Sequence, residues 1–87
     1  MDRTYSMTKE DDFIRLLGIS ADAIHTAMRD GDNKHDPGEW MTQTVEEQIK
    51  HIEGHIMQYQ MGDRSEDHLA HLLCRAAIAC ALSKDDG

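Results

Sequence analysis

Four of the six histidines in this 87-residue chain lie in two short clusters that could hold a metal ion. His51 and His55 are four residues apart, and His68 and His71 are three residues apart. On a helix, both spacings bring the two side chains onto one face. Helical bundles build metal sites from such pairs on facing helices. The sequence therefore predicts a divalent metal site between two consecutive helices.

Carboxylates accompany both histidine pairs. Glu47 lies one turn before His51, and Asp67 forms an i,i+4 pair with His71. Imidazole suits zinc, iron, manganese or nickel, whereas magnesium prefers oxygen, so Mg, Mn and other transition metals all stay open. His55 is nearer than His51 to the turn that joins the two helices, and we expect it to face the second pair. The expected metal ligands are Glu47, His51, His55, Asp67, His68 and His71.

The alternative is that the histidines are packing residues. A buried neutral imidazole needs hydrogen-bond partners, and His68 and His71 could find them in each other, in Tyr59 or in a backbone carbonyl.

Arg75 lies one turn after His71 on an otherwise apolar helix, where an arginine needs an anionic partner. Either Glu47 or Asp67 supplies that partner, or a phosphate group of a ligand does, which suits a planar guanidinium. The expected catalytic residues are Glu47, Lys50 and Arg75.

Trp40 precedes the first histidine pair, and it either holds the preceding loop in place or stacks on a base. Cys74 and Cys80 lie mid-helix in apolar surroundings that raise a thiol pKa, so a cysteine nucleophile is not expected. The sequence has neither an HExxH motif nor a serine elbow. The expected substrate-binding residues are Trp40, Lys50, Arg64 and Arg75.

Charge excludes several classes of partner. The chain has 9 Lys and Arg against 17 Asp and Glu, a formal net charge of −8. A polynucleotide or an anionic membrane would require a basic surface. No apolar run reaches the roughly 18 residues of a membrane span, and the first residues lack a signal peptide's apolar stretch. We expect a cytoplasmic protein that binds neither nucleic acid polymers nor membranes.

These residues must be positioned by helices, because strand patterns are nearly absent. The expected fold is all-α, a single domain over 1–87 that forms a small bundle of about four helices. Residues 1–35 should contain two short helices and a loop. Thr8 caps the first, which Gly18 stops, and Ser20 caps the second, which spans 21–30.

Residues 36–87 should form a long antiparallel helical hairpin that carries the histidine and acid cluster. Its first helix starts at a capping box, either at Asp36 or at Thr44, and ends by Met61. Ser65 caps the last helix, which runs from Glu66 to about 82. Because this helix is apolar almost all round and the chain is short, we expect a homo-oligomer, a dimer or larger, to complete the bundle.

The stretch from Trp40 to Leu82 resembles a phage-associated family of dATP/dGTP diphosphohydrolase-type domains. His51, the turn Gly62-Asp63 and the run from Glu66 through His71 to Ala77 carry the resemblance. More distantly, the segment is similar to the all-α NTP pyrophosphatases of the MazG type. Those enzymes hold magnesium with an ExxE and an ExxD pair, and here His68-Leu-Ala-His71 stands in place of the second pair. The imidazoles leave three alternatives: a different metal, ligands shifted to Glu47 and Asp67, or nucleotide binding without cleavage.

The resemblance implies a metal-dependent nucleotide pyrophosphohydrolase of phage type, which acts on a purine (deoxy)nucleoside triphosphate in the host cytoplasm. Metal ions would polarise the phosphates and activate a water. The alternative is a non-enzymatic helical oligomer that binds or sequesters a small nucleotide or a protein. A third interpretation is a purely structural or regulatory helical module.

Overall fold

The computed structural model describes residues 8–30 and 36–85, and these residues form helices without any strand. In chain order they are α1 (Lys9–Asp30), the short 3-10 helix η1 (Glu39–Thr42), α2 (Val45–Gln60) and α3 (His68–Asp85). The all-α expectation is confirmed. The predicted loop between α1 and η1 falls largely on residues 31–35, which lie outside the described residues.

The expectation of two short N-terminal helices is wrong, because α1 is one continuous helix of 22 residues. Gly18 lies inside it, where a glycine costs about 1 kcal/mol relative to alanine but does not force the chain to turn. The predicted cap at Thr8 is confirmed: Thr8 Oγ1 accepts from the Asp11 N–H at 3.1 Å, and Asp11 accepts from the Thr8 N–H at 2.9 Å. Ser20 lies within this helix and does not cap a second one.

α2 begins at the second of its two predicted starts. Thr44 and Glu47 form a complete capping box, in which each side chain accepts from the other residue's backbone N–H. After α2, Gly62 adopts a φ of 91°, the left-handed conformation that glycine tolerates best. The Gly62 N–H bonds to the Tyr59 carbonyl and the Asp63 N–H to the Gln58 carbonyl, both at 3.0 Å. This is a Schellman motif, and it turns the chain back toward α3.

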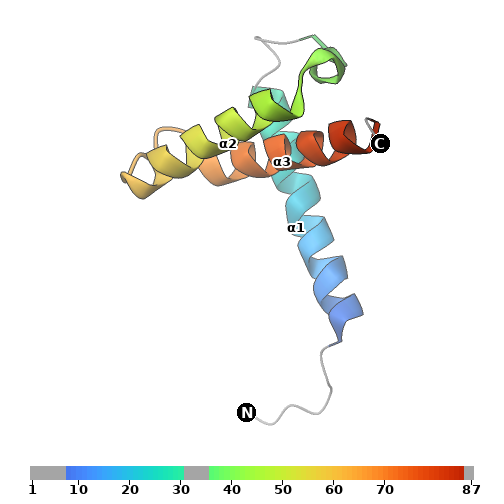
Figure 1. Cartoon of the computed structure of the whole chain (residues 1–87). Coiled ribbons are helices and arrows are strands. Elements are labelled where there is room, and N and C mark those ends of the chain that lie inside the picture. Colours follow the sequence, from blue (N-terminus) through green and yellow to red (C-terminus); the bar gives the residue numbers. More distant parts are fainter. Residues whose placement is uncertain (1–7, 31–35, 86–87) are drawn as a thin grey trace.

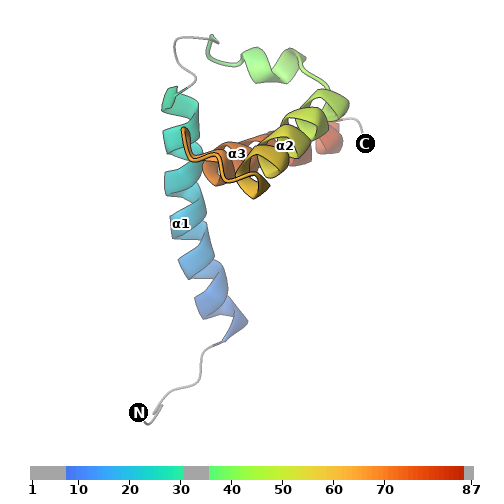
Figure 2. The ribbon, with the colours of Figure 1, turned by 90° about the vertical axis from the view of Figure 1, so that its left-hand side faces the viewer.

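α3 begins at His68, two residues later than predicted. The carboxylate of Asp67, and not Ser65, caps it by accepting from the Ala70 N–H at 3.0 Å. α2 and α3 lie side by side as the predicted antiparallel hairpin (Figure 1). α1 crosses this hairpin and contacts α3, while its N-terminal part extends away from both helices (Figure 2).

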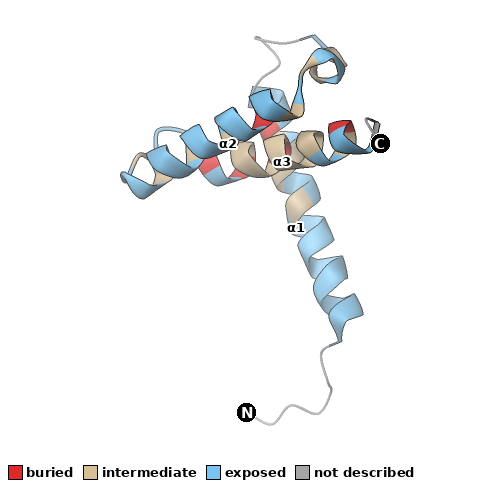
Figure 3. Cartoon of the chain, in the orientation of Figure 1, coloured by how far each residue is buried: buried red, intermediate tan, exposed pale blue. Residues whose placement is uncertain are grey.

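The core of the described chain is thin. Its buried apolar residues are Ala27 on α1 and Ala70, Cys74 and Leu82 on α3, the helix that contacts both α1 and α2. Most of α1 is exposed (Figure 3). α3 is less buried than its composition predicts, and Cys80 is exposed. The two most deeply buried side chains are polar, Gln48 and His68. No helix among the described residues is long and apolar enough to cross a membrane.

Candidate functional site

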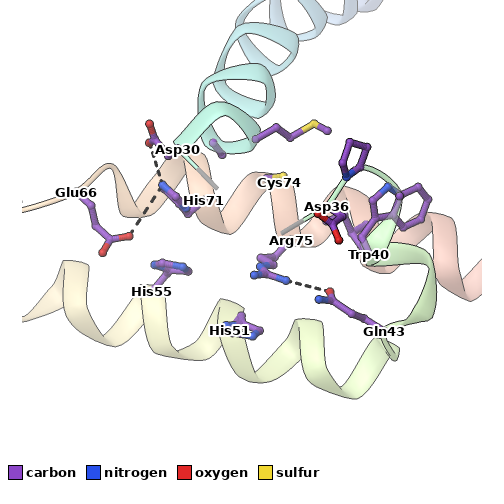
Figure 4. A pocket seen from close by; sticks show the side chains of 15 residues that line it. Asp30, Asp36, Trp40, Gln43, His51, His55, Glu66, His71, Cys74 and Arg75 are labelled. Carbon is purple, nitrogen blue, oxygen red and sulfur yellow. Dashed lines mark hydrogen bonds and ion pairs between the residues drawn. The ribbon is translucent and has the colours of Figure 1, made fainter. Parts of the chain in front are cut away.

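A cavity of about 800 Å³ opens beside the hairpin, and several of the predicted site residues line it. Its walls come from the C-terminal end of α1, the segment around η1, and the facing sides of α2 and α3 (Figure 4). His51, His55 and His71 lie along it, together with Arg75 and Trp40.

His55 and His68 make direct contact at one end of this site. The Nδ1 atoms of the two rings are 2.9 Å apart, so one ring donates to the other. The Nε2 atom of His68 lies 2.8 Å from Oδ2 of Asp63. His68 is therefore held at both nitrogens and fully enclosed, since its side chain has no exposed area. The expectation that His55 faces the second histidine pair is confirmed.

Burial and hydrogen bonding set the charge state of two groups here. The hydrogen bonds from His68 and from the Ser65 backbone lower the pKa of Asp63 to about 2, so this carboxyl is ionised at neutral pH. Burial lowers the pKa of His55, and the neighbouring His71, His68 and His51 lower it further against an opposing effect of Glu66. A neutral imidazole beside a fixed carboxylate is the state in which histidine binds metals.

His71 extends the cluster toward α1. Its Nε2 atom lies 3.2 Å from Oδ2 of Asp30 and 4.0 Å from Oε1 of Glu66. The His71 and His55 rings are 5.4 Å apart between centroids. Asp30, the last residue of α1, thus reaches a histidine 41 positions later in the chain.

Arg75 lies farther along the cavity and is bound by amides. Its Nη1 donates to Oε1 of Gln43 at 3.1 Å and to Oε1 of Gln48 at 3.0 Å. Gln48 also donates to Gln43 at 2.6 Å, and it is fully buried. Neither of the two acids predicted as its partners, Glu47 and Asp67, pairs with Arg75. Among the described residues no carboxylate forms an ion pair with this guanidinium.

Trp40 and His51 complete the lining. Trp40, in η1, lies at the end of the cavity opposite Glu66, and His51 lies between them on α2 (Figure 4). Cys74 also lines the cavity, but burial raises the pKa of its thiol, which keeps it protonated as expected.

Five predicted site residues do not line the cavity. One of them, His68, is enclosed between His55 and Asp63. Glu47 is held in the capping box of α2, and Asp67 caps α3. Lys50 is exposed on α2. Arg64 stacks over the Tyr59 ring at 3.7 Å and donates to the Tyr59 and Asp63 carbonyls.

Five residues of this region were missed as candidates. Asp63 and Glu66 belong to the motif that carried the family resemblance, and their acidity could have marked them as ligands. The other three gave no local signal, because their partners on α3 lie 27 to 41 positions away in the chain. They are Asp30, Gln43 and Gln48.

A comparison with known protein families gives a match over most of the chain. The model of the family described as dATP/dGTP diphosphohydrolase, N-terminal, matches residues 8–86. No curated protein and no solved structure gives a significant match. The matched range includes every residue of the cavity and of the histidine cluster.

Proposed function

We propose that this chain, which belongs to the dATP/dGTP diphosphohydrolase N-terminal family, is a metal-dependent nucleotide pyrophosphohydrolase. Its substrate is a purine deoxynucleoside triphosphate, cleaved between the α- and β-phosphates to a monophosphate and pyrophosphate. The family description names only the N-terminal part of such enzymes. The activity and the substrate are therefore proposed for this chain from the residues that line its cavity.

The surroundings of Arg75 are the single observation on which this proposal rests. It is a permanent cation on a cavity wall in a chain whose formal net charge is −8, and its partners are two neutral amide oxygens. Both of these bonds use Nη1, and no described residue accepts from its other guanidinium nitrogens. A planar guanidinium whose other nitrogens bond to no described residue fits a phosphate group. The phosphate alternative for Arg75 is therefore favoured over an internal ion pair.

The order of groups along the cavity suits a nucleoside triphosphate. Trp40 at one end offers an aromatic face to a base, and Arg75 with His51 lies in the middle (Figure 4). The histidine cluster and Glu66 at the other end would hold the metal. A bound divalent ion would polarise the phosphates and lower the pKa of a water there. Arg75 would stabilise the negative charge that develops on the phosphates during cleavage.

The alternative function is a protein that binds or sequesters a nucleotide without cleaving it. The match to an N-terminal part favours this alternative, because another part of such enzymes could supply groups for turnover. Binding and orientation of the nucleotide would use the same residues in both cases.

Product analysis separates the two functions. Purified protein is incubated with each NTP and dNTP in the presence of Mg²⁺, Mn²⁺ or Co²⁺, and the products are resolved by anion exchange. We expect the monophosphate and pyrophosphate from a purine deoxynucleotide, and we expect EDTA to stop their release. An unchanged panel, with binding still detectable, would establish the alternative.

We further propose that a second copy of the chain covers the exposed part of α1. Residues 8–19 are all exposed, including Phe13 at 56% and Leu17 at 54% of their full accessible area. These two continue the helical stripe of Ile24 and Ala27, through which α1 packs on the hairpin. An isolated helical segment of this length is marginal in water, and a second copy brings the same apolar stripe to a symmetric contact.

Sedimentation velocity at micromolar concentration tests this oligomer. We expect the wild-type chain to sediment as a dimer or larger and Leu17→Glu to shift it toward the monomer. Gln58→Glu, which adds the same charge at an exposed position of α2, should leave the assembly unchanged. A monomeric wild-type chain would exclude the oligomer.

A further inference from the structure

The contact between His55 and His68 has the geometry of two ligands on one metal ion. Metal–nitrogen bonds are about 2.0–2.1 Å long, so two nitrogens at right angles about an ion are separated by about 3.0 Å. The two Nδ1 atoms are 2.9 Å apart, which matches adjacent positions of an octahedron. An ion that takes the place of the hydrogen bond between the two rings would bind both Nδ1 atoms after a small turn of the rings toward it.

Asp63 favours the tautomer and the orientation of His68 that metal binding requires. A carboxylate accepts hydrogen bonds, so the contact of 2.8 Å between its Oδ2 and Nε2 of His68 favours the tautomer with the proton on Nε2. When the ring is neutral, its single proton is therefore on Nε2, and the Nδ1 lone pair points at His55. A carboxylate behind a metal-binding imidazole fixes its tautomer and orientation in this way.

Glu66 supplies a third ligand. One ligand atom from each of His55, Glu66 and His68 lies within 4.8 Å of the other two. Glu66 also lines the cavity, so its carboxylate reaches the side on which a substrate would enter. His71 is adjacent but is already bound to Asp30 at 3.2 Å.

We propose that His55, His68 and Glu66 form a two-histidine, one-carboxylate site for a first-row transition-metal ion, in which Asp63 positions His68. Three protein ligands on one side leave further coordination positions open toward the cavity. Two nitrogens among three ligands disfavour Mg²⁺, which prefers oxygen. This inference deepens the proposed function, on which its catalytic meaning rests. It also changes the expected ligand set: Glu66 enters it, and four residues leave it, Glu47, His51, Asp67 and His71.

Direct metal binding tests the site without any substrate. Tag-free, metal-depleted protein is titrated with Zn²⁺, Mn²⁺ and Mg²⁺ by calorimetry and with Co²⁺ by visible absorption. We expect one transition-metal ion per chain and at least 100-fold weaker binding of Mg²⁺. His55→Ala should weaken Co²⁺ binding by at least 100-fold, and Glu66→Gln should weaken it by about 10- to 100-fold.

Asp63→Asn separates positioning from ligation. It removes the carboxylate behind His68 and leaves all three ligands, so we expect about 10- to 100-fold weaker metal binding with the Co²⁺ spectrum still present. His25→Ala, which removes an exposed histidine on α1, is the matched control and should bind like the wild type. Circular dichroism of each variant confirms that the helices are intact.

Different results would contradict the metal site and the proposed hydrolase activity. Equal affinity for Mg²⁺ and Co²⁺, or unchanged binding in His55→Ala, would overturn the metal site even if the protein cleaves nucleotides. Tight Co²⁺ binding that depends on His55 and Glu66, without any pyrophosphate release, would support the site and remove the hydrolase.

Discussion

Replacing Arg75 by glutamine is expected to lower kcat/KM for the nucleotide by about 100- to 1,000-fold, the usual loss when one charged donor to a developing anion is removed. Gln43 and Gln48 stay bonded to each other in this variant, so the helices should be unaffected. The loss then reports the missing positive charge. Initial rates of pyrophosphate release measure it.

Two further variants test whether the positive charge of Arg75 is the cause of this loss of activity. Gln48→Glu keeps the shape of a fully buried side chain but gives Arg75 an internal carboxylate 3.0 Å away, so we expect a comparable loss with Arg75 still present. Lys50→Gln removes a positive charge from an exposed position outside the cavity, and we expect a change of less than about 2-fold, as is usual for a screened surface charge.

Binding gives a second readout that does not require turnover. Trp40 is the only tryptophan of the chain and lines the cavity, so a stacked purine should quench its fluorescence. We expect Arg75→Gln to weaken binding of the triphosphate much more than binding of the nucleoside. Equal affinities for the triphosphate in Arg75→Gln and wild type would contradict a phosphate role for Arg75.

Replacing His68 by alanine is expected to destabilise the metal-free fold by about 2–4 kcal/mol, a large part of the total for so small a domain. The ring is fully enclosed and bonded at both nitrogens, to His55 and to Asp63. Its removal leaves a cavity between α2 and α3 and two polar groups without their partner. Urea denaturation in EDTA, at matched protein concentration, measures the change.

His71→Ala is the matched comparison for this prediction. Its side chain is 22% exposed and its contacts with Asp30 and Glu66 lie at the surface of the cavity, so we expect a loss of about 0.5–1 kcal/mol. Helicity and assembly should remain intact in this variant. Equal destabilisation by the two alanines would mean that both histidines are packing residues.

Local interactions made much of the fold predictable. The capping box of Thr44 and Glu47 joins residues three positions apart, and their spacing alone gave it as one of the two starts expected for α2. The same local rules misjudged Gly18, because a single glycine in a helix costs little when the residues on both sides continue it. Whether a helix ends at such a glycine depends on what the next turn packs against.

The histidine cluster was predictable in part for the same reason. Spacings of three and four residues put His68 and His71 on one face, and the short turn brought His55 opposite them. The acidic residues beside the histidines were predicted less well. Asp67 is used to cap α3, while Glu66 and Asp63, its near neighbours, reach the cluster, and such a difference depends on the path of the turn.

The sequence by itself determined the helical class, the hairpin, the histidine-bearing faces and the need of Arg75 for a partner, because periodicity and capping act over one or two turns. Only the tertiary structure decided that Asp30 meets His71 and that Gln43 and Gln48 hold Arg75. Those pairs are 27 to 41 residues apart, and no local rule relates their positions. Packing of α1 on α3 brings Asp30 to His71, and pairing of α2 with α3 brings Gln48 to Arg75. The described partners of Arg75 are neutral amides beside an open cavity.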